Sequence, residues 1–270
     1  MRPPFPYFGA KQNVAAEVLR VLDTPHAHYV EPCAGSLSVL VAKRPVAHET
    51  ANDIDGDLVN FWRQLRDHGE ELSRLCALTP HSRREYQLAL ERSEEPLEQA
   101  RRTWVRLTQS IGGSLRAGSG WRHYQKPSGR GGHGMGHILA SYVDRMGPVI
   151  ERLSAVSLEC RPALEVIADY GRHDGVLMYL DPPYLGATRS AGSTNYRHEM
   201  WGKDAHRELL EAARAAACKV AISGYECDLY DEMLVDWHRH RFTAFAGNGH
   251  QNRARVEIIW TNYSPSMTLF

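Results

Sequence analysis

The chain has 270 residues, 43% of them hydrophobic, which allows one large domain or a core domain with an insertion. No apolar run approaches the ~20 residues of a membrane span and the N-terminus lacks the apolar core of a signal peptide, so we expect a cytoplasmic protein that does not contact a membrane. Lysine plus arginine and aspartate plus glutamate both number 32, which disfavours a broad basic face but leaves local basic patches open.

The five cysteines form no close pairs and show no His–Cys spacing typical of metal ligands. This pattern favours free thiols in a reducing compartment, and we expect no metal site. Cys33 follows a proline, but a small packed thiol is the default interpretation for it rather than a nucleophile.

The first 58 residues predict one βαβ unit. A helical pattern over 14–22 is followed by a short strand ending at 29–32, a turn of small residues at 33–36 and a helix over 37–43. A second strand over 46–51 leads into an acidic segment at 52–55. Asp53 lies roughly 20 residues after the glycine turn, where dinucleotide folds bind ribose hydroxyls. The unit therefore favours a cofactor that contains adenosine, and Glu31 either orients that cofactor or hydrogen-bonds its own loop.

The composition changes near residue 58. Residues 58–110 predict helices, whereas 111–136 are glycine-rich and basic and form a segment too long for a simple connection. After a helix around 137–153, the pattern alternates again, with strands at 156–160, 176–180 and 219–224 and helices at 162–171 and 204–217. Residues 241–263 predict two antiparallel strands. We therefore expect an α/β fold with a mostly parallel sheet and an antiparallel C-terminal hairpin.

The segment Asp181-Pro182-Pro183-Tyr184 follows the apolar strand at 176–180. Two prolines prevent further ladder pairing, so an acid and a ring are held at the carboxyl end of a central strand, where open α/β sheets bind ligands. The Asp181 carboxylate and the Pro182 carbonyl can accept hydrogen bonds from an amino group, and Tyr184 can stack on a ring. We predict a pocket for a planar ring with an exocyclic amino group.

Five motifs in this order resemble those of the Dam-like (D12 class) adenine-N6 DNA methyltransferases. They are residues 7–11, 31–36, 52–58, 181–184 and 256–263. The sequence of residues 181–184 is identical to the family's catalytic tetrapeptide. The resemblance implies a Rossmann-like methyltransferase sheet built from residues 1–58 and 155–270. It also implies an inserted, mainly helical target-recognition domain at 59–154.

The resemblance further implies transfer of a methyl group from S-adenosylmethionine to the amino group of a flipped adenine in double-stranded DNA. The catalytic residues that it implies are Asp181, Pro182 and Tyr184. The cofactor-binding residues that it implies are Tyr7, Lys11, Glu31, Pro32, Gly35, Asp53, Ile54 and Asp181. One departure is Arg161-Pro162, which stands where the family usually has an acid that reads the adenine of the cofactor.

Basic side chains interleave with aromatic rings in the glycine-rich segment, and others follow the tetrapeptide. Arginine can pair with phosphates or guanine edges, so these residues are candidates for DNA contacts, with a solvated loop as the alternative. The DNA-binding residues that we expect are Arg116, Arg122, Lys126, Arg130, Arg189 and Tyr196.

Two alternatives to adenine methylation stay open at this point. Cytosine-N4 methylation uses an amino group with the same electronics, although Asp181 at the first position of the tetrapeptide favours adenine. The second alternative is a DNA-binding relative of these enzymes that has lost catalytic activity. The presence of both Asp181 and Tyr184 disfavours it. A cognate restriction endonuclease is a candidate partner, but we do not expect a nuclease in the same chain.

Overall fold

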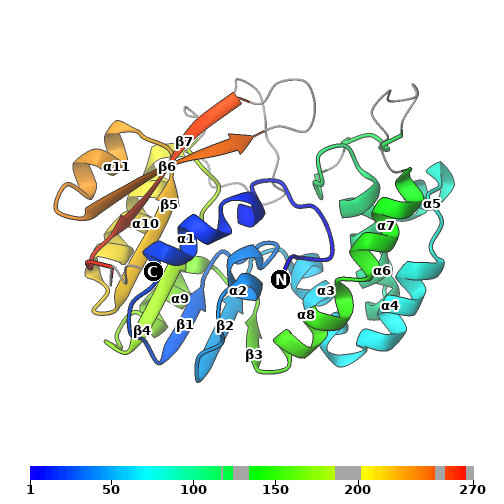
Figure 1. Cartoon of the computed structure of the whole chain (residues 1–270), viewed down its shortest axis with the longest axis horizontal. Helices are drawn as coiled ribbons and strands as arrows, with labels where there is room; N and C mark the ends of the chain where they lie inside the picture. Colours follow the sequence, from blue (N-terminus) through cyan, green and yellow to red (C-terminus); the bar gives the residue numbers. More distant parts are fainter. Residues whose placement is uncertain (117, 124–133, 186–201, 247–252, 266–270) are drawn as a thin grey trace. The chain divides into compact units, whose positions relative to one another are not determined.

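The computed structural model describes residues 1–116, 118–123, 134–185, 202–246 and 253–265 (Figure 1), and for 244–246 and 253–255 it describes the backbone alone. The described residues form two compact units. One is a helical unit made of Met1–Ala10 and Asp55–Ala155. The other, the sheet unit, contains Lys11–Ile54 and the described residues from Val156 onward.

A seven-stranded sheet in the order β3-β2-β1-β4-β5-β7-β6 forms the centre of the sheet unit. Neighbours from β3 to β5 run parallel, and β7 is antiparallel to both β5 and β6. The predicted mostly parallel sheet with an antiparallel C-terminal hairpin is confirmed. The strands are β1 (His28–Glu31), β2 (His48–Asn52), β3 (Val156–Glu159), β4 (Val176–Leu180), β5 (Lys219–Gly224), β6 (His238–Ala246) and β7 (Arg253–Thr261).

The order of the strands reverses between β1 and β4, which are neighbours in the sheet although a long stretch of chain separates them. Open α/β sheets bind ligands at such a switch point, beyond the carboxyl ends of the strands. Glu31 ends β1 and Asp181 follows β4 directly, so both acids lie at this point.

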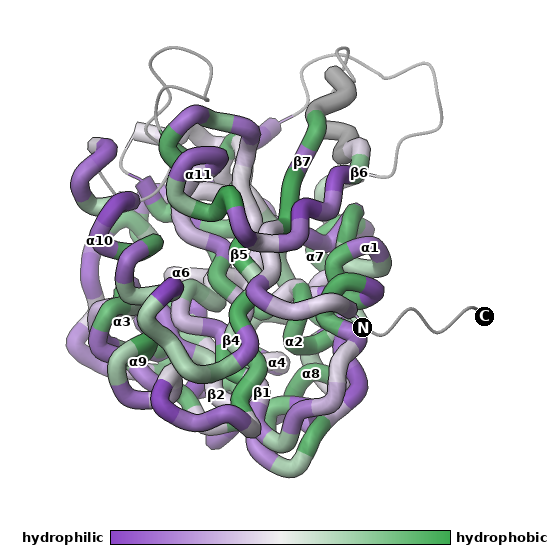
Figure 2. The backbone as a smooth tube through the Cα atoms, turned by 90° about the vertical axis from the view of Figure 1, so that its left-hand side faces the viewer, coloured by the Kyte–Doolittle hydropathy of each residue, from purple (hydrophilic) through white to green (hydrophobic). Residues whose placement is uncertain are grey.

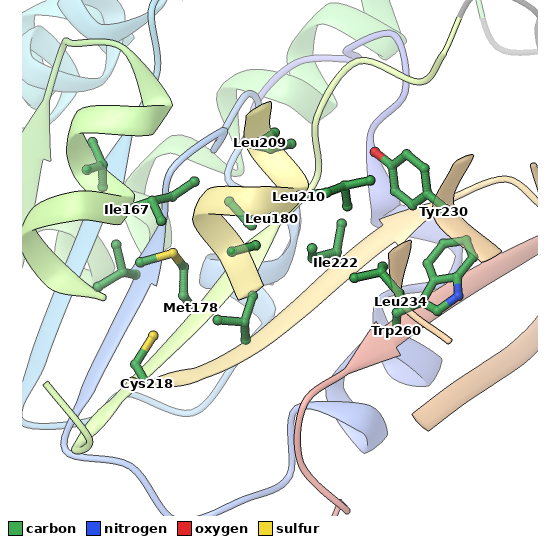
Figure 3. Packing of buried hydrophobic residues seen from close by; sticks show 14 of the residues in the cluster. Ile167, Met178, Leu180, Leu209, Leu210, Cys218, Ile222, Tyr230, Leu234 and Trp260 are labelled. Atoms are coloured by element: carbon green, nitrogen blue, oxygen red, sulfur yellow. The ribbon is translucent and has the colours of Figure 1, made fainter. Parts of the chain in front are cut away.

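One face of the sheet carries a compact apolar core. All five residues of β4 are buried, and Met178 and Leu180 pack with Ile222 on β5 and Trp260 on β7 (Figure 3). Leu209 and Leu210 of α10 (Gly202–Ala215) cover them, together with Ile167 of α9 (Ala163–Tyr170). Figure 2 shows β4 mostly green, whereas α10 alternates between purple and green, as expected for an amphipathic helix. Each fully buried aliphatic side chain stabilises the fold by about 1.5–3 kcal/mol.

Short helices complete the sheet unit. The other described ones are the 3₁₀ turn η1 (Lys11–Asn13), α1 (Ala15–Val21), α2 (Ser38–Ala42) and α11 (Asp228–Met233). The sequence did not predict helix α11, because the periodic pattern of a six-residue helix is too short to be recognised.

The helical unit contains α3 (Gly56–Asp67), α4 (Gly69–Leu78), α5 (Arg83–Leu88), α6 (Pro96–Gln109), α7 (Met135–Val143) and α8 (Met146–Leu153). Asp55 caps α3 by accepting hydrogen bonds from the backbone N–H groups of Asp57 and Leu58. The first residues of the chain belong to this unit: Phe5 packs on Phe61 and Trp62.

The single helix expected over 137–153 is two helices, α7 and α8. Pro148 lacks the N–H that would bond the carbonyl of Asp144, so the helical ladder is interrupted between them. The structure therefore corrects this expectation, and the proline in the sequence gives the physical reason.

Candidate functional site

The acidic side chain of Asp181 is held by a lysine from the start of the sheet unit. Lys11 Nζ lies 2.9 Å from Asp181 Oδ1, and the lysine side chain is 4% exposed against 20% for the aspartate. This ion pair holds the Asp181 carboxylate in place, and the oxygens of a carboxylate group accept hydrogen bonds. The structure thus brings together two residues that the sequence analysis placed in the site from motifs 170 positions apart.

A second carboxylate, Glu257 on β7, also faces Lys11. Glu257 Oε2 lies 3.8 Å from Lys11 Nζ and accepts a hydrogen bond of 3.5 Å from the Tyr184 hydroxyl. The lysine ammonium stands 4.6 Å from the centroid of the Tyr184 ring, close enough for a cation–π contact. Sequence reasoning did not single out Glu257, although an acid inside the apolar run at 256–260 is a signal that could have found it.

The ring of Tyr184 has an aromatic neighbour. Tyr225 packs edge-on against it, with centroids 4.5 Å apart and planes at 69°. Burial and the nearby carboxylates of Asp181 and Glu257 raise the pKa of Tyr184 well above its ordinary value, so its phenol stays neutral. The ring is therefore a fixed, uncharged surface next to the Asp181 carboxylate.

On the β1 side, a turn of small residues follows Glu31 and Pro32. Gly35 has φ +50°, a left-handed conformation that glycine adopts without strain, and its N–H donates to Asp53 Oδ2 over 2.8 Å. Asp53 thereby connects the glycine turn to the end of β2. Burial raises the pKa of the Cys33 thiol in this turn, so the side chain is a packed thiol and not a thiolate nucleophile.

Asn52 joins the loops that follow two different strands. Its side chain, 1% exposed, donates to the carbonyls of Pro32 and Arg161 and accepts from the Arg161 N–H, over 2.8, 3.0 and 3.0 Å. Pro32 follows β1 and Arg161 follows β3, so one amide sets the spacing of both loops. Sequence reasoning missed this role, because an asparagine at a strand end is ordinary until the loops around it are known.

The departure at Arg161 has a structural explanation. Its guanidinium pairs with Glu159 and, over 2.6 Å, with Asp169. The side chain is thus used within its own β3–α9 connection. Near its backbone, Ile54 is 49% exposed and its carbonyl lies 4.0 Å from the Cys160 thiol.

Glu31 is a buried carboxyl with an unusual proton affinity. Burial raises its pKa to about 8, although the Tyr29 hydroxyl donates to Glu31 Oε1 over 2.8 Å and opposes that shift. A raised carboxyl pKa means that the folded state retains a proton that the unfolded state releases above about pH 4.5. The contribution of the Glu31 carboxyl to the free energy of unfolding is therefore fully present below about pH 4.5 and is lost as the pH rises towards 8.

We expect Glu31→Gln to remove this pH dependence, because an amide keeps the neutral form's shape and cannot ionise. Between pH 5.5 and 7.5, the free energy of unfolding of the wild type should fall relative to that of the variant by about 1.4 kcal/mol per pH unit. Urea unfolding of both proteins at several pH values measures the difference. Parallel curves would show that Glu31 titrates normally in the folded protein.

The remaining predicted site residues lie in the helical unit or outside the described residues. Tyr7 follows the segment that packs on α3, and its carbonyl accepts from Ala10. Arg116 is exposed and Arg122 half-buried. Lys126, Arg130, Arg189 and Tyr196 fall outside the described part of the chain.

A stack of rings orders the chain next to Arg122. Trp121 stacks with His81 and with His123, with centroid distances of 4.5 and 5.1 Å, and the Arg83 guanidinium is 4.7 Å from its centroid. Its indole N–H donates to Gln109 at the end of α6. This part of the glycine-rich segment is thus a defined surface with aromatic and cationic groups.

The described residues contain neither a metal-binding cluster nor a membrane-spanning helix. No group of three or more His, Cys, Asp or Glu side chains there could hold a metal ion. No helix among them is long and apolar enough to cross a membrane. All five cysteines are described and none of them forms a disulfide.

Comparisons with known proteins show which family this chain resembles. The family model for the D12 class N6 adenine-specific DNA methyltransferase matches residues 7–246. The type II methyltransferase M1.LlaDCHI of Lactococcus lactis subsp. cremoris is 26% identical over 282 residues, which cover 97% of this chain and 96% of the relative.

Two solved structures are similar at a low level. The rRNA methyltransferase aviRa from Streptomyces viridochromogenes is 13% identical with a TM-score of 0.40, over 97% of this chain and 88% of its own. A SAM-dependent methyltransferase from Agrobacterium tumefaciens is 11% identical with a TM-score of 0.35, over 94% of this chain and 61% of its own.

Proposed function

Because this chain belongs to the D12 class of N6 adenine-specific DNA methyltransferases, we propose that Asp181, Pro182 and Tyr184 bind the adenine whose amino group it methylates. The observation that supports this most is the Asp181 carboxylate, paired with Lys11 beside the neutral ring of Tyr184. The family's reaction is methylation of adenine N6 in DNA, which decides between the alternatives of adenine and cytosine.

The chemistry requires acceptors at the amino group. An adenine amino nitrogen is a poor nucleophile because its lone pair is delocalised into the ring. Hydrogen bonds from its N–H groups to the Asp181 carboxylate and the Pro182 carbonyl favour a pyramidal nitrogen and stabilise the positive charge that develops there. Tyr184 offers a ring on which the extruded base stacks, which offsets part of the cost of leaving the duplex.

The acidic character of the pocket fits S-adenosylmethionine, the cofactor of the family, which carries positive charge and supplies an electrophilic methyl group when bound. We assign its binding to Tyr7, Lys11, Glu31, Pro32, Gly35, Asp53, Ile54 and Asp181. Asp53 suits ribose hydroxyls at the end of β2, and the glycine turn permits close approach to the backbone. Positioning of both reactants supplies much of the rate enhancement.

DNA recognition is assigned to the helical unit, in line with an inserted target-recognition domain at 59–154. Arg116, Arg122 and the rings around Trp121 are the described groups that suit phosphates and base edges. Lys126, Arg130, Arg189 and Tyr196 stay predictions.

We expect Arg116→Ala with Arg122→Ala to weaken DNA binding at least tenfold and leave cofactor affinity unchanged. Each lost phosphate contact should also lower the slope of log affinity against log salt by about 1. Fluorescence anisotropy with a duplex that contains the methylation site, at several salt concentrations, measures both. The matched control is Arg74→Ala, an exposed arginine on α4; equal affinity of the double variant and this control would contradict the assignment.

The name of the Lactococcus relative, a type II methyltransferase, supports a role in restriction–modification. In that role, methylation by this chain protects DNA from a cognate restriction endonuclease, whose recognition sequence the two proteins share.

The test of the function is product analysis. Duplex DNA is incubated with the protein and S-adenosylmethionine, digested to nucleosides and analysed by mass spectrometry, and the modified positions are mapped. N6-methyladenine at one defined sequence is the expected result. N4-methylcytosine, or no modified base, would overturn the proposal.

A further inference from the structure

A serine on the strand next to Asp181 contacts the same carboxylate oxygen as Lys11. Ser223 on β5 is 0% exposed, and its Oγ lies 2.6 Å from Asp181 Oδ1. The Leu180 carbonyl lies farther from the same hydroxyl, at 3.4 Å. A hydroxyl has one proton, and the contact of 2.6 Å with the Asp181 carboxylate is much shorter than the one of 3.4 Å with the Leu180 carbonyl, so the proton goes to Asp181.

The contacts with Ser223 and Lys11 therefore involve the same oxygen of the Asp181 carboxylate. In the part of the chain that the structure describes, its hydrogen bond from Ser223 and its ion pair with Lys11 both end on Oδ1, at 2.6 and 2.9 Å. Each carboxylate oxygen has about two lone-pair positions, so these two donors occupy Oδ1. The oxygen that is left for an incoming N–H is Oδ2.

We propose that Ser223 is a positioning residue for methyl transfer: with Lys11 it fixes Oδ1 of Asp181 and so presents Oδ2 to the amino group of the adenine. The proposal rests on the assigned role of Asp181. Ser223 does not touch the adenine in this arrangement. It acts by preventing rotation of the carboxylate, which would otherwise present either oxygen, or neither, in the direction of the base.

The surroundings of Ser223 favour this role over simple packing. Its backbone is paired with Ile259 on β7, and the adjacent strand residue Ile222 belongs to the apolar core on the other face. An alanine would satisfy the same backbone pairing. What a serine adds at this buried position is one donor, and the nearest acceptor is the acid of the tetrapeptide.

The test compares Ser223→Ala, Ser223→Thr and a matched control, Thr50→Val. Thr50 on β2 is 1% exposed and its hydroxyl lies 2.9 Å from His28, so the control also removes one buried hydroxyl contact from the same sheet. Single-turnover rates with tritiated S-adenosylmethionine, KM for cofactor and DNA, and the melting temperature are measured for each.

We expect Ser223→Ala to lower kcat by about 10- to 100-fold, the effect of one charge-assisted hydrogen bond. KM for cofactor and DNA should change less than threefold, and Ser223→Thr should recover most of kcat. Thr50→Val should leave kcat within twofold. A Ser223→Ala protein with full kcat, or a Ser223→Thr protein as slow as Ser223→Ala, would overturn the proposal.

Asp181→Asn provides a second test that does not depend on how Ser223 variants fold. With donors at the Oδ1 position, the amide turns its oxygen towards Ser223 and Lys11 and presents its NH2 to the adenine amino group, a donor against a donor. Activity should fall more than 100-fold, and retention of a tenth of the activity would contradict the arrangement. If Asp181→Ala is fully active the proposed function fails, whereas a normal Ser223→Ala beside an inactive Asp181→Ala refutes only this inference.

Discussion

Replacing Asp181 with alanine should reduce methyl transfer by about 100- to 1000-fold and leave the sheet unit folded. The variant loses the acceptor that we propose to favour a pyramidal amino nitrogen and to stabilise its developing charge, and effects of this type reach about 10²–10³ for one group. The Pro182 carbonyl is then the remaining acceptor of the tetrapeptide. Tritium transfer to duplex DNA under single-turnover conditions measures the loss.

A matched control for this variant lies at the other end of the same strand. Asp174 is exposed and precedes β4, so Asp174→Ala tests the removal of a carboxylate without a change at the site. It should retain full activity. If Asp181→Ala methylates DNA within tenfold of the wild-type rate, the assignment of the catalytic acceptor is wrong.

Replacing Lys11 with methionine should affect stability and activity together. The ammonium is buried between Asp181 and Glu257, at 2.9 and 3.8 Å, and methionine keeps the length of the side chain without its charge. Breaking a buried ion pair leaves uncompensated charge and costs about 3–5 kcal/mol. Urea unfolding at pH 8 measures the loss.

A double variant separates the electrostatic effect from lost packing. Lys11→Met with Glu257→Gln removes one of the two carboxylates and should recover part of the stability lost in Lys11→Met. Lys203→Met, an exposed lysine at the start of α10, is the control and should be close to the wild type. If Glu257→Gln brings no recovery in the Lys11→Met background, the two side chains do not interact through charge.

The order of elements and the central acid of the site were predictable from local patterns. The strand at 176–180 is a short apolar run, and the prolines after it can end a strand but not continue one, so Asp181 had to stand at a strand end. The same logic applies to the glycine turn after β1. These features depend on neighbours in sequence, and local patterns report them well.

The side chains that contact Asp181 were harder to predict from the sequence. Lys11 came from the family motif, but Ser223 and Glu257 reach the site only because β5 and β7 bring them to the same face of the sheet. A register shift of one residue would turn both side chains to the opposite face. Register follows from the assembled sheet and not from the local sequence. Asn52 was missed for a related reason, since its partners, Pro32 and Arg161, lie 20 and 109 positions away.

The pairing of β2 with β3 has a consequence for how the chain folds. The two strands are neighbours in register from Glu49 with Val156 to Asn52 with Glu159, so about 100 residues must be synthesised before they can meet, and closing a loop of that length has an entropic cost. A pair of strands alone is marginal in water, so β1 and β2 must wait for β4. Most of the helical unit, 55–155, is by contrast contiguous in sequence. During synthesis we expect the helices to assemble first, with the N-terminal segment around Phe5 already available to them, and the catalytic sheet to form last.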